Sequence, residues 1–385
     1  MQCSARLRSV YVIPDDLNQY VPPHFAKDIV QWQKKHGRNS LPWQNTRDPY
    51  RVWLSEIMLQ QTQVATVIDY YDRFLQRFPT VADLGAAHQD EVLALWSGLG
   101  YYSRARNMHR CAQQVMALHA GQFPQTAEQL QTLPGIGPST AAAVASFCFA
   151  ERVAILDGNV KRVLTRVLAF SGDLSEGAPV RQLWRLATSL LPDSHLTETM
   201  PRYSQGLMDL GATVCTLRKP QCAGCPVQGI CQGFAKGEPE KYPVKTKKLK
   251  RSAQKLSLLW AQRPDGSVWL ERRPVTGIWG GLYCLPVFES EDSLKAFMPH
   301  QLHQQLVPLK AFKHVLTHKD LYLCPVMVSF SATQKMPLNT PSVFDAPNLE
   351  PSGAWFSPAE WPVLGLPAPI RKLLTDDAIE DQCLD

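Results

Sequence analysis

Four closely spaced cysteines constrain the fold of this chain more than any other feature. The intervals between them are six, two and five residues, and the four are Cys215, Cys222, Cys225 and Cys231. Four thiolates can complete the coordination of one tetrahedral zinc ion or hold one [4Fe–4S] cluster. Zinc sites more often contain two Cys-x-x-Cys pairs, whereas this chain has one such pair, followed by Pro226. The spacing therefore favours an iron–sulfur cluster, with zinc as the alternative, in a loop at the edge of a larger helical region.

Length and composition narrow the class of protein. The 385 residues are enough for two domains, each with its own hydrophobic core. The six other cysteines are scattered, which beside a metal-type cluster suggests a reducing, intracellular compartment. No run approaches the ~20 apolar residues that a membrane span needs, so we expect no membrane association. The formal net charge of +6 is compatible with a polyanionic partner.

The first part of the chain is predicted to be helical. Apolar residues recur at spacings of three and four from about residue 25 to residue 234, with breaks at Pro and Gly. The helical patterns cover residues 52–78, 91–99, 103–118, 127–133, 139–149 and 160–170. Thr126 is expected to cap one of these helices, and Pro138 occupies a favoured first helical position.

The period shifts towards two beyond a stretch rich in lysine. Residues 256–261 and 268–270 are predicted to form a hairpin, and residues 321–330 a strand that Pro325 would place at an edge or bulge. We therefore predict a mainly α N-terminal region followed by an α+β domain. The segments are an extension (1–22), a helical domain (23–236) containing a helix–hairpin–helix (about 126–150) and the cysteine loop (215–231), a basic linker (237–255) and the α+β domain (256–385).

A glycine-rich turn lies between two of the helical patterns, at residues 133–137. Gly135 and Gly137 permit a tight turn whose backbone N–H groups point outward at the start of the next helix. Such a turn suits one phosphate of a nucleic-acid backbone, although generic helix connections also contain glycines.

Two carboxylates stand out beside these elements. Asp157 and Asn159 flank a glycine immediately before a helix, so Asp157 is either an N-terminal cap or an anion held where a substrate cation develops. Glu56 lies near Trp53 on a helical pattern. Poor solvation there would raise the pKa of Glu56 and keep a proton available near neutrality, whereas the alternative is an exposed polar stripe.

Several polar and aromatic residues could contact a nucleic-acid duplex. Gln60, Gln61 and Gln63 continue the helical pattern and offer an uncharged edge for contact with bases. Tyr101 and Tyr102 follow a glycine-flexed turn and precede arginines, which suits insertion into a duplex and contact with its backbone. Burial in the core is the alternative for each tyrosine.

Together these elements resemble the helix–hairpin–helix, iron–sulfur DNA glycosylases, and among them the MutY-type adenine DNA glycosylases. The resemblance runs from about residue 25 to the last helix. Its motifs occur in the family order at residues 41–43, 56–63, 98–102, 133–137 and 157–160, followed by the four cysteines. The resemblance implies a hydrolase, acting as a monomer on double-stranded DNA with A:8-oxoguanine or A:G mispairs. It also implies a cytoplasmic location, nucleoid-associated if the source is bacterial.

The resemblance assigns roles to single residues. It implies that Glu56 protonates the extruded adenine and then handles the attacking water, and that Asp157 stabilises the sugar cation with support from Asn159. This agrees with the two-carboxylate logic of sugar hydrolysis. It further implies DNA or lesion contacts for Gln61, Tyr101, Gly135, Gly137, Ser139 and Gln205. Related glycosylase/lyases carry a lysine in place of Ser139, so we predict a monofunctional glycosylase.

The C-terminal region resembles the NUDIX-like domain with which such enzymes read 8-oxoguanine. It lacks the metal-binding box of NUDIX hydrolases after Gly281, so we expect recognition without nucleotide hydrolysis. The family's recognition loop corresponds to residues 314–318, which implies lesion contacts for Thr317 and His318, with Leu316 in place of an aromatic residue. The alternatives are an endonuclease III-like lyase on oxidised pyrimidines and a non-catalytic iron–sulfur DNA-binding protein.

Overall fold

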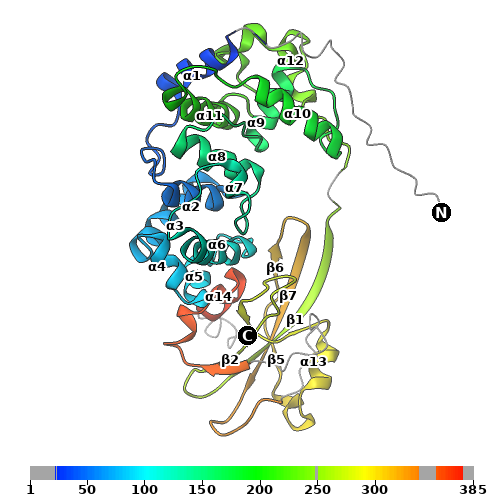
Figure 1. Ribbon diagram of the computed structural model, residues 1–385. Helices are drawn as coiled ribbons and strands as arrows, with labels where there is room; N and C mark the ends of the chain where they lie inside the picture. Colours follow the sequence, from blue (N-terminus) through cyan, green and yellow to red (C-terminus); the bar gives the residue numbers. More distant parts are fainter. Residues whose placement is uncertain (1–21, 23, 248–249, 338–352, 376–385) are drawn as a thin grey trace, which may run out of the picture. The chain divides into compact units, whose positions relative to one another are not determined.

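The described chain forms two compact units. The structure is a computed structural model that describes residues 22, 24–247, 250–337 and 353–375 (Figure 1). Of the described residues, the first unit comprises 22, 24–53, 124–132 and 136–247, and the second comprises 54–123, 133–135, 250–337 and 353–375. The predicted extension (1–22) lies outside the described residues except for its last position. No helix in the described ranges is long and apolar enough to cross a membrane.

The first unit is helical and is organised around α11. Its elements are α1 (Phe25–His36), α7 (Ala127–Leu130), α8 (Pro138–Phe149), α9 (Gly158–Val167), α10 (Gly177–Ser189), α11 (Leu196–Thr213) and α12 (Gln232–Ala235). Helix α11 packs against α1, α8 and α9. The Thr126 side chain accepts a hydrogen bond from the backbone N–H of Gln129, and Pro138 begins α8, so both predicted helix starts are confirmed.

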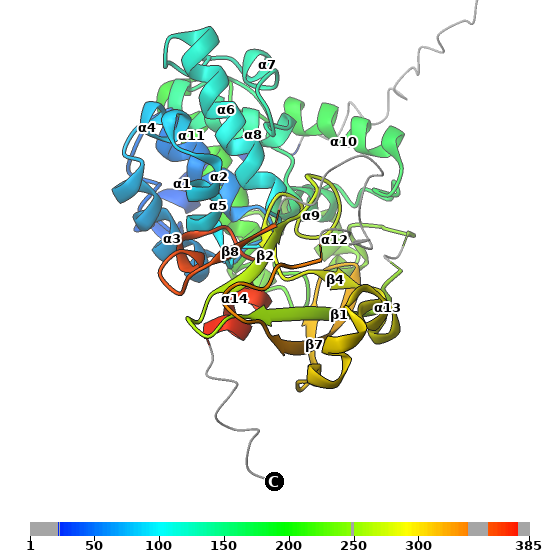
Figure 2. The same ribbon diagram turned by 90° about the horizontal axis from the view of Figure 1, so that it is seen from below.

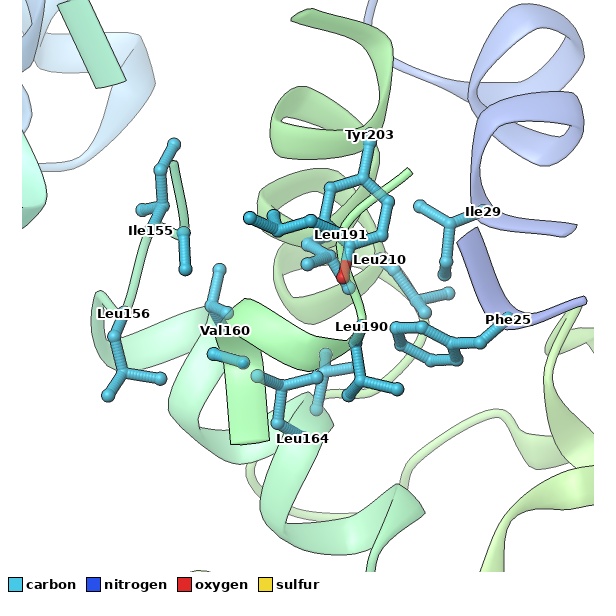
Figure 3. Packing of buried hydrophobic residues seen from close by; sticks show 14 of the residues in the cluster. Phe25, Ile29, Ile155, Leu156, Val160, Leu164, Leu190, Leu191, Tyr203 and Leu210 are labelled. Atoms are coloured by element: carbon cyan, nitrogen blue, oxygen red, sulfur yellow. The ribbon is translucent and has the colours of Figure 1, made fainter. Parts of the chain in front are cut away.

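The core of this unit is built from the apolar stripes of α1, α9 and α11. Figure 3 shows side chains of the three helices converging, and the rings of Phe25 and Tyr203 meet edge to face with centroids 6.2 Å apart. Each large apolar side chain buried there contributes about 1.5–3 kcal/mol. Helix α11 approaches α9 closely because residue 211 is a glycine. A Cβ on Gly211 would lie 2.6 Å from the Cβ of Asn159.

The helices of the second unit precede its sheet in sequence. They are the last part of α2 (Pro49–Leu59), then α3 (Val64–Arg77), α4 (Val81–Ala86), α5 (Gln89–Trp96) and α6 (Ser103–His119). The predicted continuous pattern over 52–78 is divided into α2 and α3. Gln61 between them has φ +60°, in the left-handed region, so the prediction that Gln60 and Gln63 continue a helix is wrong.

The rest of the second unit is a sheet with flanking helices. Its elements are β1 (Ser252–Gln262), β2 (Val268–Arg272), β3 (Tyr283–Cys284), β4 (Val287–Phe288), α13 (Glu291–Phe297), β5 (Val307–Pro308), β6 (Phe312–Val315), β7 (Lys319–Ser329), β8 (Gly353–Phe356) and α14 (Ala368–Thr375). The strand order is β3-β2-β1-β7-β5. Strands β1 and β7 run parallel along their full length (Figure 2). Gln262 pairs with Val268 across the predicted hairpin, which is thereby confirmed.

Two details of the sheet differ from the sequence prediction. Strand β1 begins at Ser252, inside the segment interpreted as linker. Strand β7 carries Pro325 but is not at an edge, since β1 pairs on one side and β5 and β6 pair on the other. Pro325 is tolerated because β6 pairs as far as Leu323 and β5 pairs from Val326, so the missing N–H falls where the partner strand changes.

Candidate active site and cysteine pocket

The four predicted ligand cysteines line one pocket of the first unit. They share it with apolar side chains of α9, α11 and the cysteine loop, among them Val163, Val167, Leu210, Val214 and Val227. All four thiols are free and half-buried. Among the described residues, no group of three or more His, Cys, Asp or Glu is arranged to hold a single metal ion.

The chemistry of this donor set fits a large group bound by thiolates. Burial raises the pKa of Cys225 to about 12, and the neighbouring thiols Cys215, Cys231 and Cys222 add to the rise. The four sulfurs therefore interact electrostatically, and four bare thiolates in this pocket would repel one another. A cationic metal centre removes this penalty because it deprotonates and binds thiols.

Two arginines of α9 fasten the cysteine loop to the helix. The buried Arg166 guanidinium donates to Cys215 Sγ at 3.3 Å and to the carbonyl oxygens of Thr216 and Leu217 at 2.7 and 3.0 Å. Arg162 Nε donates to the Cys215 carbonyl at 2.7 Å, and its Nη2 donates to Asn159 Oδ1 at 2.8 Å. Asn159 and Cys215 are thus joined through one side chain.

Sequence reasoning missed these arginines. Their positions in the helical pattern could have indicated them, because Arg162 and Arg166 are one helical turn apart on a strongly amphipathic helix. Arg166 falls beside the apolar positions Val163 and Val167, and its side chain is only 1 % exposed. A buried arginine requires acceptors, and the cysteine loop supplies them.

Asp157 is the N-terminal cap of α9. Its Oδ1 accepts a hydrogen bond from the Val160 N–H at 2.7 Å. Burial raises the pKa of Asp157, while the N–H groups of Val160 and Asn159 and then the charges of Arg162 and Lys161 oppose the rise. The carboxylate is therefore poorly hydrated, and such an anion interacts strongly with a cation that develops beside it.

Glu56 and Gln61 lie at the end of α2. Glu56 is half-buried in the last turn of the helix, and Gln61 follows in its left-handed conformation. The convergence of Glu56 and Asp157 stays a prediction.

A buried arginine on α6 shapes the turns that carry Gln61 and Tyr101. Arg104 donates to the carbonyl oxygens of Ile57, Met58 and Gln60 after α2, and to those of Leu99 and Gly100 before Tyr101. Burial lowers its pKa to about 10, which leaves it charged at neutral pH. The interpretation that the arginines after Tyr102 are suited to contact a nucleic-acid backbone is therefore wrong for Arg104, whose side chain is occupied within the fold.

The two tyrosines of this turn differ in exposure. Tyr101 is 41 % exposed and has its ring 5.5 Å from the Arg104 guanidinium carbon. Tyr102 is only 9 % exposed and donates to the Leu366 carbonyl at 3.4 Å. Tyr101 can therefore insert into a duplex as an aromatic wedge, whereas Tyr102 is a core residue.

One pocket of the second unit brings several predicted DNA-contact residues together. It has a volume of about 260 Å³, and its lining includes Gln61, Tyr101, Ser103, Asn107 and Gly135. Gly135 has φ +77°, and a Cβ there would lie 2.7 Å from the Cβ of Asn107, so only glycine fits.

The other positions of the glycine-rich turn begin α8. Gly137 is exposed and caps this helix, and a Cβ there would meet nothing within 4 Å. Ser139 is half-buried in the first turn. Gly137 is thus exposed at the start of a helix, where the helix dipole favours an anion such as phosphate.

The remaining predicted contacts lie on α11 and on the turn between β6 and β7. The Gln205 amide donates to Asp209 Oδ1 at 3.0 Å, so this side chain is held against the next turn of α11. Thr317 and His318 are exposed, and the Thr317 hydroxyl is hydrogen-bonded to the Tyr101 hydroxyl. Thr317 and Tyr101 are thus brought together within the second unit.

The comparisons with known proteins agree with this arrangement. Residues 54–188 match the family model of the HhH-GPD superfamily base excision DNA repair proteins, and residues 258–376 match that of the NUDIX domain. An adenine DNA glycosylase of Buchnera aphidicola is 35 % identical over 355 residues, covering 91 % of this chain and 96 % of the relative. The chain belongs to the adenine DNA glycosylase family. The prediction of a MutY-type member with a mainly α region and a NUDIX-like domain is confirmed.

Other known proteins match a smaller share of the chain. The human adenine DNA glycosylase is 43 % identical over 225 residues, covering 56 % of this chain and 40 % of the human protein. Among solved structures, a thermostable thymine-DNA glycosylase is 28 % identical, with a TM-score of 0.48, over 55 % of this chain and 95 % of that chain. Membership of the adenine DNA glycosylase family disfavours the alternative of an endonuclease III-like lyase.

Proposed function

We propose that this adenine DNA glycosylase hydrolyses the N-glycosidic bond of adenine mispaired with 8-oxoguanine or guanine in duplex DNA. The observation that carries the proposal is the carboxylate of Asp157, poorly hydrated and capping α9 beside two cationic side chains. Breaking the bond leaves an oxocarbenium-like sugar, and an anion in such surroundings stabilises it. The base must first leave the stack to reach this carboxylate.

Each side chain has a defined task in the proposed reaction. Glu56 gives its proton to the departing adenine, so the bonding electrons leave with the base. Water then adds to the sugar carbon and returns a proton to Glu56. Asn159, held by Arg162, keeps the loop before α9 in place so that Asp157 faces the sugar.

Single-turnover base release tests this function. Duplexes with adenine opposite 8-oxoguanine, guanine and thymine are compared for the wild type and for Glu56→Gln. We expect release from the first two duplexes and a loss of about 10²–10⁴-fold for the variant, the usual contribution of a general acid. Equal rates on all three duplexes, or an unaffected variant, would refute the assignment.

We further propose that the four cysteines hold a [4Fe–4S] cluster, which supplies a rigid cross-link for the loop and no hydrolytic step. The single Cys-x-x-Cys pair and the pocket that all four thiols line support this choice. Purified protein should be brown and contain about four irons per chain. A colourless protein with stoichiometric zinc would establish the alternative.

The NUDIX-like domain is proposed to read 8-oxoguanine through Thr317 and His318. The support is the contact between Thr317 and Tyr101, which puts a recognition-loop hydroxyl beside the proposed wedge. Thr317→Ala should reduce the preference for 8-oxoguanine over guanine roughly tenfold, the value of one hydrogen bond, while Thr317→Ser should preserve it. Identical preferences in both variants would remove Thr317 from the recognition site.

The remaining proposals concern oligomeric state, location and lyase chemistry. We propose a monomer that acts in the cytoplasm, associated with the nucleoid if the source is bacterial. Because Ser139 provides no amine, borohydride should trap little covalent enzyme–DNA complex. Trapping as efficient as that of a true lyase would contradict the monofunctional mechanism.

A further inference from the structure

The beginning of the basic linker is fastened to the first unit. The Tyr242 carbonyl accepts from Arg166 Nε at 3.2 Å, and the Val244 carbonyl accepts from the Leu174 N–H at 3.0 Å. The Thr246 hydroxyl donates to Asp173, as does its N–H at 3.3 Å. The described chain before residue 248 is therefore a bound strap, not a tether.

The last residue of the strap is held twice. The Lys247 N–H donates to Ser175 Oγ at 3.2 Å, and Lys247 Nζ pairs with Glu176 at 2.9 Å. Asp173, which accepts from Thr246, also accepts from the Ser175 N–H at 2.8 Å. Both carboxylates of the loop before α10 are thus engaged with the strap.

Lys245 lies between two anchored residues of this strap. Its neighbours Val244 and Thr246 are the ones hydrogen-bonded to the loop before α10, so its backbone position is fixed. Its side chain is exposed and has no hydrogen bond or ion pair with any residue that the structure describes. This cation is therefore available to an external anion.

A second such cation, Lys161, lies on α9, the helix whose Arg166 holds the Tyr242 carbonyl of the strap. Lys161 is half-buried and likewise has no ion-pair partner in the described part of the chain. Burial lowers the pKa of Lys161, and the charge of Lys245 lowers it further, against the opposing effect of Asp157. Lys161 follows the proposed sugar-stabilising carboxylate by one helical turn, and the strap that carries Lys245 is bonded to the same helix through Arg166.

We propose that Lys161 and Lys245 form a two-lysine clamp for one backbone phosphate of the DNA strand that carries the extruded adenosine. The proposal rests on the proposed function, because that function places the sugar at Asp157. Phosphates flank every nucleotide sugar, and Lys161 follows Asp157 by four residues on the same helix face. A phosphate between the two ammonium groups replaces their repulsion by two attractions.

The salt dependence of DNA binding tests the clamp. The full-length protein is titrated with a duplex carrying a non-hydrolysable 2′-fluoro adenosine opposite 8-oxoguanine, at several salt concentrations. Lys245→Ala should lower the slope of log K against log salt by about 1, the value for one lost phosphate contact. Lys27→Ala, which removes another exposed lysine, on α1, is the matched control and should leave the slope unchanged.

Two further variants separate a clamp from a general charge effect. Lys161→Ala and Lys245→Ala should be non-additive when combined, because both contact the same phosphate. Thr246→Val releases the strap without changing charge and should reproduce part of the Lys245→Ala loss. Additive losses, or a Lys245→Ala slope equal to that of Lys27→Ala, would overturn the clamp.

Base release distinguishes failure of the clamp from failure of the proposed function. If the wild type releases adenine opposite 8-oxoguanine but the Lys245→Ala slope is unchanged, only the clamp is wrong. If the wild type releases no adenine, the proposed function is wrong, whatever the slope. Unchanged melting temperatures of Lys161→Ala and Lys245→Ala show that these two substitutions act on binding.

Discussion

The guanidinium of Arg166 lies 3.3 Å from the sulfur of Cys215, in a side chain that is only 1 % exposed. The same guanidinium also holds the Thr216, Leu217 and Tyr242 carbonyl oxygens. One buried cation thus organises the cysteine loop and the beginning of the strap. Its charge is compensated when the sulfurs are thiolates bound to a metal cluster.

Replacing Arg166 should release the cysteine loop. Arg166→Ala leaves buried carbonyl oxygens without donors, so we expect a loss of about 3 kcal/mol in the free energy of unfolding. We also expect faster loss of bound iron to a chelator, followed by visible absorbance. Arg181→Ala, on the exposed face of α10, is the control. Iron release at the wild-type rate would show that Arg166 does not support the loop.

Asp157→Asn should separate stability from activity. Burial raises the pKa of Asp157, so ionising this group costs the folded state free energy, and the cost is fully present above the folded pKa. Asparagine stays neutral and still caps a helix. The variant should therefore be at least as stable as the wild type at neutral pH, with the difference vanishing below the unfolded pKa of about 3.9.

The same variant should lose base release by about 10²–10³-fold, as for other lost electrostatic stabilisers of a transition state. Thermal melting at pH 7 and pH 3 and single-turnover release at pH 7 measure the two effects. An active Asp157→Asn enzyme would refute the role of the carboxylate.

Asp173→Asn should loosen the strap in a pH-dependent way. The Thr246 hydroxyl and then the Ser175 N–H lower the pKa of Asp173 to about 2. The stabilisation is therefore fully present above the unfolded pKa of about 3.9 and is lost as the pH falls towards 2. Urea unfolding should show the variant weaker at pH 6, with a smaller deficit at pH 3. Asp193→Asn, an exposed carboxylate, should show no such trend.

Gly135→Ala should damage the glycine-rich turn. The new Cβ would lie 2.7 Å from Asn107 Cβ at a φ of +77°, so steric overlap and backbone strain add. We expect a loss of about 2–3 kcal/mol in the free energy of unfolding and weaker DNA binding. Gly137→Ala meets no atom within 4 Å at an ordinary φ and should retain wild-type stability. Equal stability of the two variants would show that the turn adapts to a side chain at residue 135.

The sequence predicted correctly those features that interactions between near neighbours along the chain determine. Thr126 and Pro138 begin α7 and α8 as expected because capping and a fixed φ act within one turn. The hairpin between β1 and β2 follows from a turn sequence between apolar runs. The cysteine intervals indicated a shared pocket because four thiols so close in sequence can be gathered by one loop.

Distant contacts decided the rest. The break between α2 and α3 depends on Arg104, which is more than forty residues away and takes the carbonyl groups of Ile57, Met58 and Gln60 that a continuous helix would use. Pro325 is interior because two different strands share one side of β7. Residue identities along the chain determined which groups could cap, ligate or ionise. Only the tertiary structure decided which carbonyls, thiols and cations meet, because a hydrogen bond or a charge pair depends on distance in space, and periodicity along the chain does not report that distance.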